Sequence, residues 1–186
     1  MVNTSEGERL SGVHILPSGE PAGRPLLVLG FGGNAWNGDD VAAYLHGLFP
    51  HADVVAFHYR GYAPSTGRPS TAALLSDAPV IYDEIQRKIG PIRTVAVGFS
   101  IGAGVAAHLA SQRPLDGLIL VTPFDSLKAL ASEHYPGVPM GWLLRHHLSV
   151  TESLRGLTVP TAVIAAGRDT IVPSRRTEPV RQAASN

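Results

Sequence analysis

The stretch Val95–Gly102, which reads Val-Ala-Val-Gly-Phe-Ser-Ile-Gly, constrains this chain more than any other. An apolar run ends at Ser100, a glycine lies two residues to either side of that serine, and a small-residue apolar segment follows as far as Ala110. This order predicts a buried strand, a tight turn and a helix. In such a turn we expect a strained serine backbone, and glycines at 98 and 102 because a Cβ there would strike the neighbouring strand or helix.

Apolar runs alternate with helical patterns along the rest of the chain. We predict strands over residues 12–16, 26–30, 53–59, 95–99, 117–121 and 161–165. We predict helices over residues 39–49, 71–89, 101–110 and 139–147, and the first turns of another after residue 175. The alternation indicates an α/β fold with a mostly parallel, doubly wound sheet and helices on both faces. Ligands of such folds bind at the carboxyl ends of the strands.

Local signals set the expected ends of two helices. Asp39 or Asp40 is the predicted N-cap of the helix that runs to residue 49. Pro79 is predicted to break or kink the helix over 71–89, with Asp77 as the cap of a second helical piece.

Composition limits the classes of function. The 186 residues are 44% apolar, enough for one domain, and carry 15 basic and 15 acidic side chains. This balance gives no electrostatic case for a nucleic-acid partner. The absence of cysteine excludes disulfides and thiolate metal sites, and no run approaches the roughly 20 apolar residues of a membrane span. We expect a cytoplasmic protein that needs no metal.

Ser100 is a candidate nucleophile, which would need oxyanion donors, a base and an acid. The candidate donors are the backbone N–H of Ile101 and that of Asn34, in the glycine-rich loop after the first core strand. Asp169 is the candidate acid because it ends the last visible strand and follows the serine in the chain. Asp125, at the end of the preceding strand, is the reserve acid, although a helix cap is its commoner role.

Five stretches occur in an order that is more specific than the serine turn alone. They are Phe31–Asn37, Tyr59–Gly67, Gly98–Gly102, Pro123–Leu127 and Pro160–Pro173. Together they resemble α/β-hydrolase fold proteins, and within them the Bem46-like branch of serine hydrolases. The resemblance implies cleavage of carboxylic esters or thioesters through an acyl-enzyme on Ser100, with Asp169 as the acid, Asn34 and Ile101 as oxyanion donors, and no cofactor.

The histidine base of that family follows the acid in the chain, and here every histidine precedes Asp169. The eight are His14, His46, His51, His58, His108, His134, His146 and His147. We therefore expect a single domain over 1–186 with a small cap-like segment at about 127–158, whose C-terminal strand, helix and histidine are missing through truncation. His58 is a weak substitute base, and His108 is too far along its helix from Ser100.

Two alternatives stay open. The chain is either complete as a non-catalytic binding or scaffold protein that keeps the hydrolase pocket, or it receives a strand and base from a partner chain. A sheet lacking its last strand would expose an edge, so we expect a homodimer. The aromatic residues expected to line the pocket are Trp36, Tyr62, Phe99, Tyr135 and Trp142.

Overall fold

The computed structural model describes residues 1–19, 23–90, 93–134, 148–167 and 172–184. Its main sheet consists of β3 (Gly12–Ile15), β4 (Leu26–Phe31), β5 (Asp53–Phe57), β6 (Arg93–Phe99), β7 (Gly117–Val121) and β8 (Thr161–Ile164). The strands lie in the order β3-β5-β4-β6-β7-β8, and only β3 is antiparallel to its neighbour. The predicted mostly parallel sheet is confirmed. A two-stranded sheet of β1 (Val2–Asn3) and β2 (Arg9–Leu10), which the sequence did not predict, precedes it.

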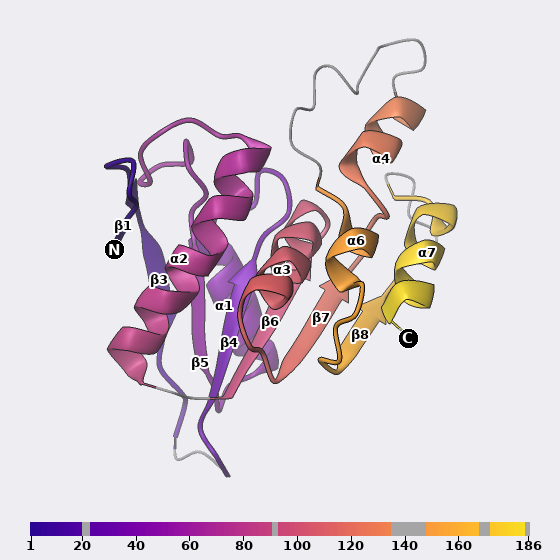
Figure 1. Ribbon diagram of the computed structural model, residues 1–186. Helices are drawn as coiled ribbons and strands as arrows, with labels where there is room; N and C mark the ends of the chain where they lie inside the picture. The colour runs from indigo at the N-terminus through magenta and orange to yellow at the C-terminus, as the bar shows by residue number, and fades with distance from the viewer. Residues whose placement is uncertain (20–22, 91–92, 135–147, 168–171, 185–186) are drawn as a thin grey trace.

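Helices cover both faces of this sheet, as predicted (Figure 1). They are α1 (Gly38–Leu48), α2 (Thr71–Ile89), α3 (Ile101–Gln112), α4 (Leu127–His134), α6 (Val150–Leu154) and α7 (Ser174–Ala184). In Figure 1, α2, α3 and α6 lie in front of the strands and α1 lies behind them. Alternate residues of the strands therefore enter two separate cores, one under α2 and α3 and the other under α1.

β4 shows why the middle of the sheet reads as an uninterrupted apolar run. Leu27, Val28 and Leu29 are fully buried, the two leucines against α2 and α3 and the valine against α1. Val28 is in register with Val54 of β5 on one side and Val95 of β6 on the other. A strand covered on both faces has no position that favours a polar side chain.

Two local predictions need correction: the break at Pro79 with Asp77 as a cap, and the N-cap of α1. α2 is one continuous helix through Pro79, and Asp77 lies inside it and pairs with Arg60 instead of capping a second piece. Packing of the helix against the sheet outweighs the backbone hydrogen bond that proline cannot donate. The N-cap of α1 is Asn37, whose side chain accepts from the N–H of Asp40, so neither predicted aspartate caps it. The predicted helix over 139–147 lies outside the described residues.

Candidate active site

Ser100 occupies the turn between β6 and α3. Its φ of 53° and ψ of −116° lie outside the regions that non-glycine residues usually adopt, an arrangement that costs about 1–3 kcal/mol. The backbone N–H donates to the carbonyl of Val121 at 2.9 Å, which ties the turn to the end of β7. The residue is half-buried and its side chain makes no capping hydrogen bond to α3. The hydroxyl is therefore not used to stabilise its own helix.

The glycines on either side of Ser100 allow close backbone approaches. A Cβ on Gly98 would overlap the carbonyl of Gly102 and lie 2.6 Å from the Cα of Ala103. A Cβ on Gly102 would overlap the carbonyl of Phe31 and lie 2.5 Å from that of Gly32. Both distances are shorter than any side chain tolerates, so the structure gives the same reason for these glycines as the sequence.

Backbone strain gathers at the carboxyl ends of the central strands. Besides Ser100, the non-glycine residues with positive φ among the described ones are Ala35, at 60°, and Thr122, at 46°. They follow β4 and β7, which flank β6 in the sheet. Such outliers persist only where the surrounding structure fixes them, and they are enriched at functional sites.

The loop after β4 lies directly against Ser100. A Cβ built on Gly33 would be 3.7 Å from the Cβ of Ser100 and 3.5 Å from the carbonyl oxygen of Phe99. Asn34, the next residue, is exposed, and it lines a cavity together with Ile101. Ile101 begins α3, and N–H groups in the first turn of a helix have no intrahelical acceptor. The two predicted oxyanion donors thus belong to residues on either side of the serine turn.

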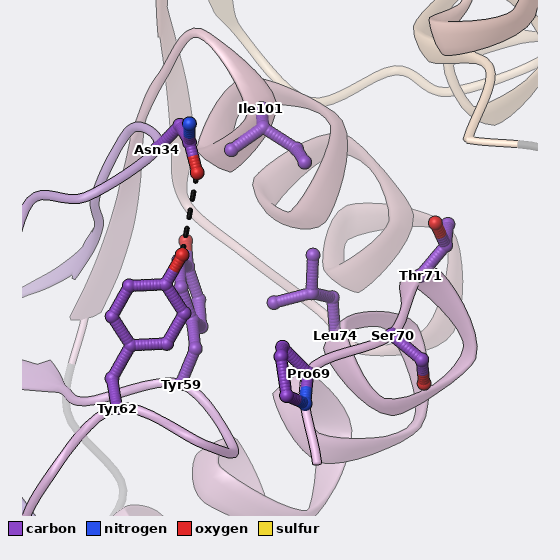
Figure 2. Close-up of a pocket in the computed structure, with 8 residues that line it drawn as sticks. All are labelled: Asn34, Tyr59, Tyr62, Pro69, Ser70, Thr71, Leu74 and Ile101. Atoms are coloured by element: carbon purple, nitrogen blue, oxygen red, sulfur yellow. Dashed lines mark hydrogen bonds between the residues drawn. The ribbon is translucent and has the colours of Figure 1, made fainter.

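Two tyrosines from the loop after β5 hold the loop after β4 (Figure 2). The hydroxyl of Tyr59 donates to the carbonyl of Gly32 at 2.9 Å, and that of Tyr62 donates to Oδ1 of Asn34 at 3.3 Å. Burial raises the pKa of Tyr59, and the nearby Tyr62 adds to the shift, so its hydroxyl stays protonated and keeps donating. Sequence reasoning had singled out Tyr62 but had missed Tyr59, whose role depends on a contact between two loops.

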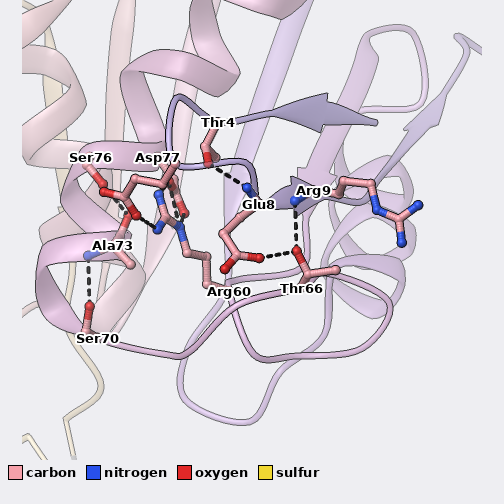
Figure 3. Close-up of polar contacts among 10 residues, drawn as sticks. Thr4, Glu8, Arg9, Arg60, Thr66, Ser70, Ala73, Ser76 and Asp77 are labelled. Atoms are coloured by element: carbon pink, nitrogen blue, oxygen red, sulfur yellow. Dashed lines mark hydrogen bonds and ion pairs between the residues drawn. The ribbon is translucent and has the colours of Figure 1, made fainter.

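A buried ion pair anchors the loop that carries these tyrosines (Figure 3). Nε of Arg60 is 2.8 Å from Oδ2 of Asp77, and Nη2 is 2.6 Å from Oδ1. The hydrogen bonds to Asp77 raise the pKa of Arg60, which also pairs with Glu6 of the N-terminal segment. Both Arg60 and Asp77 are buried. The pair therefore joins the loop after β5 to α2 and to the segment between β1 and β2.

The structure describes only one of the two candidate acids, Asp125. Asp169 lies outside the described residues, so its position relative to Ser100 stays a prediction. Asp125 accepts a hydrogen bond from Nη1 of Arg176 at 3.0 Å, and its backbone N–H donates to the carbonyl of Arg176 at 2.9 Å. It does not cap α4, because Oγ of Ser126 accepts from the N–H of Ala129 instead. Asp125 joins the end of β7 to the start of α7.

In the part of the chain that the structure describes, no hydrogen bond or ion pair joins a histidine side chain to Ser100. The buried ring of His58 accepts from the N–H of Gly38 at 3.4 Å through Nδ1, and its Nε2 is 3.2 Å from Oδ2 of Asp39. This ring therefore faces the first turn of α1. His108 is half-buried on α3, where desolvation lowers its pKa. Among the described residues, no group of three or more histidines and carboxylates could hold a metal ion.

The aromatic predictions are only partly met. Trp36 and Phe99 stack edge to face with ring centroids 4.9 Å apart, and Tyr44 of α1 completes the cluster. Phe99 shares the α1 side of the sheet with Val97, as strand alternation requires, so it packs against α1 and does not line the cavity beside Asn34. Tyr62 does line that cavity. Tyr135 and Trp142 lie outside the described residues.

The sheet, the strained serine turn and the loops at its carboxyl edge are those of a hydrolase fold. A family model described as alpha/beta hydrolase fold matches residues 26–142, and the chain belongs to this family. The predicted resemblance to the Bem46-like branch is confirmed by its relatives. None of the helices in the described part of the chain is long and apolar enough to cross a membrane.

Curated proteins and solved structures match this chain over different parts of its length. An uncharacterized protein of Mycobacterium tuberculosis, Rv2307c, is 37% identical over the whole chain, which spans 66% of that protein's length. Lysophosphatidylserine lipase ABHD12 of Danio rerio is 33% identical over 64% of this chain and 36% of its own. The Pyrococcus furiosus esterase Pf2001 superposes with a TM-score of 0.76 at 19% identity, covering 99% of this chain and 76% of that one. The likeness to Pf2001 shows the fold, and the chain spans less than two thirds of the length of these curated relatives.

Proposed function

We propose that the chain carries the nucleophile and the oxyanion hole of a serine hydrolase that cleaves carboxylic esters or thioesters. The observation that carries the proposal is the strained, uncapped Ser100 directly after β6, which precedes Ile101 and lies against Gly33, the residue before Asn34. A serine held in this conformation costs stability, and its hydroxyl takes no part in capping α3.

In the proposed reaction, Oγ of Ser100 attacks the acyl carbon and loses its proton to a base. The backbone N–H groups of Asn34 and Ile101 stabilise the negative charge on the carbonyl oxygen, and the first turn of α3 adds the positive end of its dipole. The alcohol or thiol leaves with a proton, and water then releases the acid from Ser100. Asp169 orients the base in this proposal. The base is a histidine outside the described residues.

A fluorophosphonate probe tests the nucleophile directly. We expect Oγ of Ser100 to displace fluoride and form a stable phosphonate ester, seen as one added mass on the intact protein and located to Ser100 by peptide mapping. Probe left unreacted after prolonged incubation, or attached to another serine, would contradict the proposal.

The second candidate is a non-catalytic binding protein that keeps the same cavity. One observation favours this candidate. His58 lies at the carboxyl end of β5, but its ring contacts the first turn of α1 and so does not serve Ser100 as a base. Specific labelling of Ser100 distinguishes the two, because a binding protein has no need of an activated hydroxyl.

We also propose a homodimer formed through β8, an edge strand of the described sheet that carries the exposed Ile164. An edge strand offers unpaired N–H and C=O groups to a second copy, and a charge on it opposes such pairing. Light scattering should give the mass of two chains for the native protein and of one for Ile164→Lys. A native protein with the mass of one chain at micromolar concentration would exclude this dimer.

A further inference from the structure

The cavity lined by Asn34 and Ile101 has a volume of about 210 Å³ and is built from four parts of the chain: the loop after β4, the loop after β5, α2 and α3. Asn34 and Ile101, which follow Gly33 and Ser100 in the chain, form one end, and the loop after β5 forms one wall with Tyr59 and Tyr62. The first turns of α2 form the opposite wall. In Figure 2, Leu74 points into the space between Ile101 and Pro69, across from the two tyrosines.

The lining determines what kind of group the cavity can hold. Its apolar surface comes from Leu74, Ile101 and the tyrosine rings, and its polar atoms are neutral hydroxyls and an amide. No lining residue carries a formal charge at neutral pH, since the lining contains no acidic or basic side chain and burial raises the pKa of Tyr59 further. A carboxylate, phosphate or ammonium group would have no counter-charge there, and its desolvation would be unfavourable. The lining therefore suits an uncharged, largely apolar group.

The volume sets a limit on size. Pockets for drug-sized ligands start at about 300 Å³, so this cavity is small. At roughly 30 Å³ for each group of water size, 210 Å³ holds about seven such groups. We expect an acyl chain of up to about six carbons to stay within this volume, and a chain of ten or more carbons to extend past it.

We propose that this cavity is the acyl pocket, that it takes a neutral acyl group of up to about six carbons, and that Leu74 sets the length limit. The inference rests on the proposed function, since it places the acyl carbon at Ser100. It narrows that function to short-chain esters and thioesters and assigns the length limit to one side chain of α2.

A series of p-nitrophenyl esters from acetate to decanoate tests the limit. We expect native kcat/KM to be highest between butanoate and hexanoate and to fall for decanoate. Leu74→Ala removes the side chain between Ile101 and Pro69, so the ratio of decanoate to butanoate kcat/KM should rise at least about 10-fold, the effect of a changed methylene in an apolar pocket. An unchanged ratio in Leu74→Ala would overturn the inference.

The neighbouring Leu75 provides a matched control. It is also a half-buried leucine of α2, but it packs against the cluster of Phe124, Leu130 and Leu148 and does not line the cavity. Leu75→Ala should lose similar packing and keep the native chain-length preference. A preference shifted equally by both variants would attribute the effect to loosening of α2 and overturn the role of Leu74.

A binding measurement separates failure of the pocket from failure of the proposed function. The Ser100→Ala protein is prepared with isotope-labelled leucine and isoleucine methyl groups. Methyl butanoate is added in steps, and the NMR chemical shifts of these protein methyl groups are followed. We expect changes at the methyls of Leu74 and Ile101, and none at those of Leu75. If these shifts change but the native protein does not hydrolyse esters, the acyl pocket is supported and the proposed hydrolase function is contradicted. If the methyl shifts of Leu74 do not change, the acyl pocket is overturned.

Discussion

In protein that carries the base, replacing Ser100 with alanine is expected to lower kcat for p-nitrophenyl butanoate by at least about 10³-fold, because the acyl-enzyme forms on Ser100. Alanine keeps the Cβ and leaves the backbone of the turn as strained as before. The loss should therefore appear in turnover with little change in the denaturation midpoint. Stopped assays of the native and variant proteins at equal concentration measure it.

Two further variants separate loss of the nucleophile from loss of the fold. Ser111→Ala removes an exposed hydroxyl from the same α3, where it donates only to the carbonyl of His108, and should leave the rate unchanged. Ser100→Gly should also be inactive, yet raise the free energy of unfolding by about 1 kcal/mol, because glycine adopts φ of 53° without strain. Full turnover by Ser100→Ala would remove Ser100 from the mechanism.

Replacing Gly102 with alanine is expected to lower the free energy of unfolding by more than about 3 kcal/mol. The added Cβ would overlap the carbonyl of Phe31 and press on that of Gly32, and both belong to backbone that the middle of the sheet holds in place. α3 would have to move away from β4, so the loop carrying Asn34 would shift as well. Urea denaturation with its midpoint and slope measures the loss.

Gly47 is the matched control for this substitution. It too is a helical glycine, in α1, but a Cβ built on it meets nothing within 4 Å. Gly47→Ala should therefore raise the free energy of unfolding by about 0.5–1 kcal/mol, since alanine is the better helix former. Equal effects of the two substitutions would show that close approach at Gly102 is not what requires a glycine there.

The order of strands and helices could be predicted because burial on both faces leaves a strong signal. β4 and β6 read as apolar runs of strand length, and the helical stripes of α1 and α2 have the spacing of one buried face. The hairpin of β1 and β2 could not be predicted in this way. Its strands have two residues each, too few to show an alternation.

Helix ends were harder to predict than helices because several residues compete for the same role. Asn37, Asp39 and Asp40 can all cap, and the backbone geometry selects Asn37. At the start of α4 the same competition favours Ser126 over Asp125, whose carboxylate has a cationic partner in Arg176 from a distant part of the chain. Long-range partners of this kind leave no local pattern.

At the candidate active site, the sequence predicted the backbone requirements correctly. It predicted the directions of the side chains less well. The need for glycine at 98 and 102 follows from the turn itself, and the close approaches bear it out. Phe99 is among the aromatic residues expected to line the pocket, although alternation along β6 puts it with Val97 on the α1 side. Counting alternate residues back from the turn would have identified this.

The order of strands in the sheet has a consequence during synthesis. β4 pairs with β5 on one side and with β6 on the other. The last residue of β6, Phe99, follows the last residue of β4, Phe31, by 68 residues (99 − 31), which takes roughly 3–14 s at usual elongation rates. Until β6 has been synthesised, β4, an apolar strand that is buried in the folded protein, has an open edge. Slower translation lengthens the period in which it can aggregate, so the yield of folded protein in cells depends on elongation rate as well as on stability.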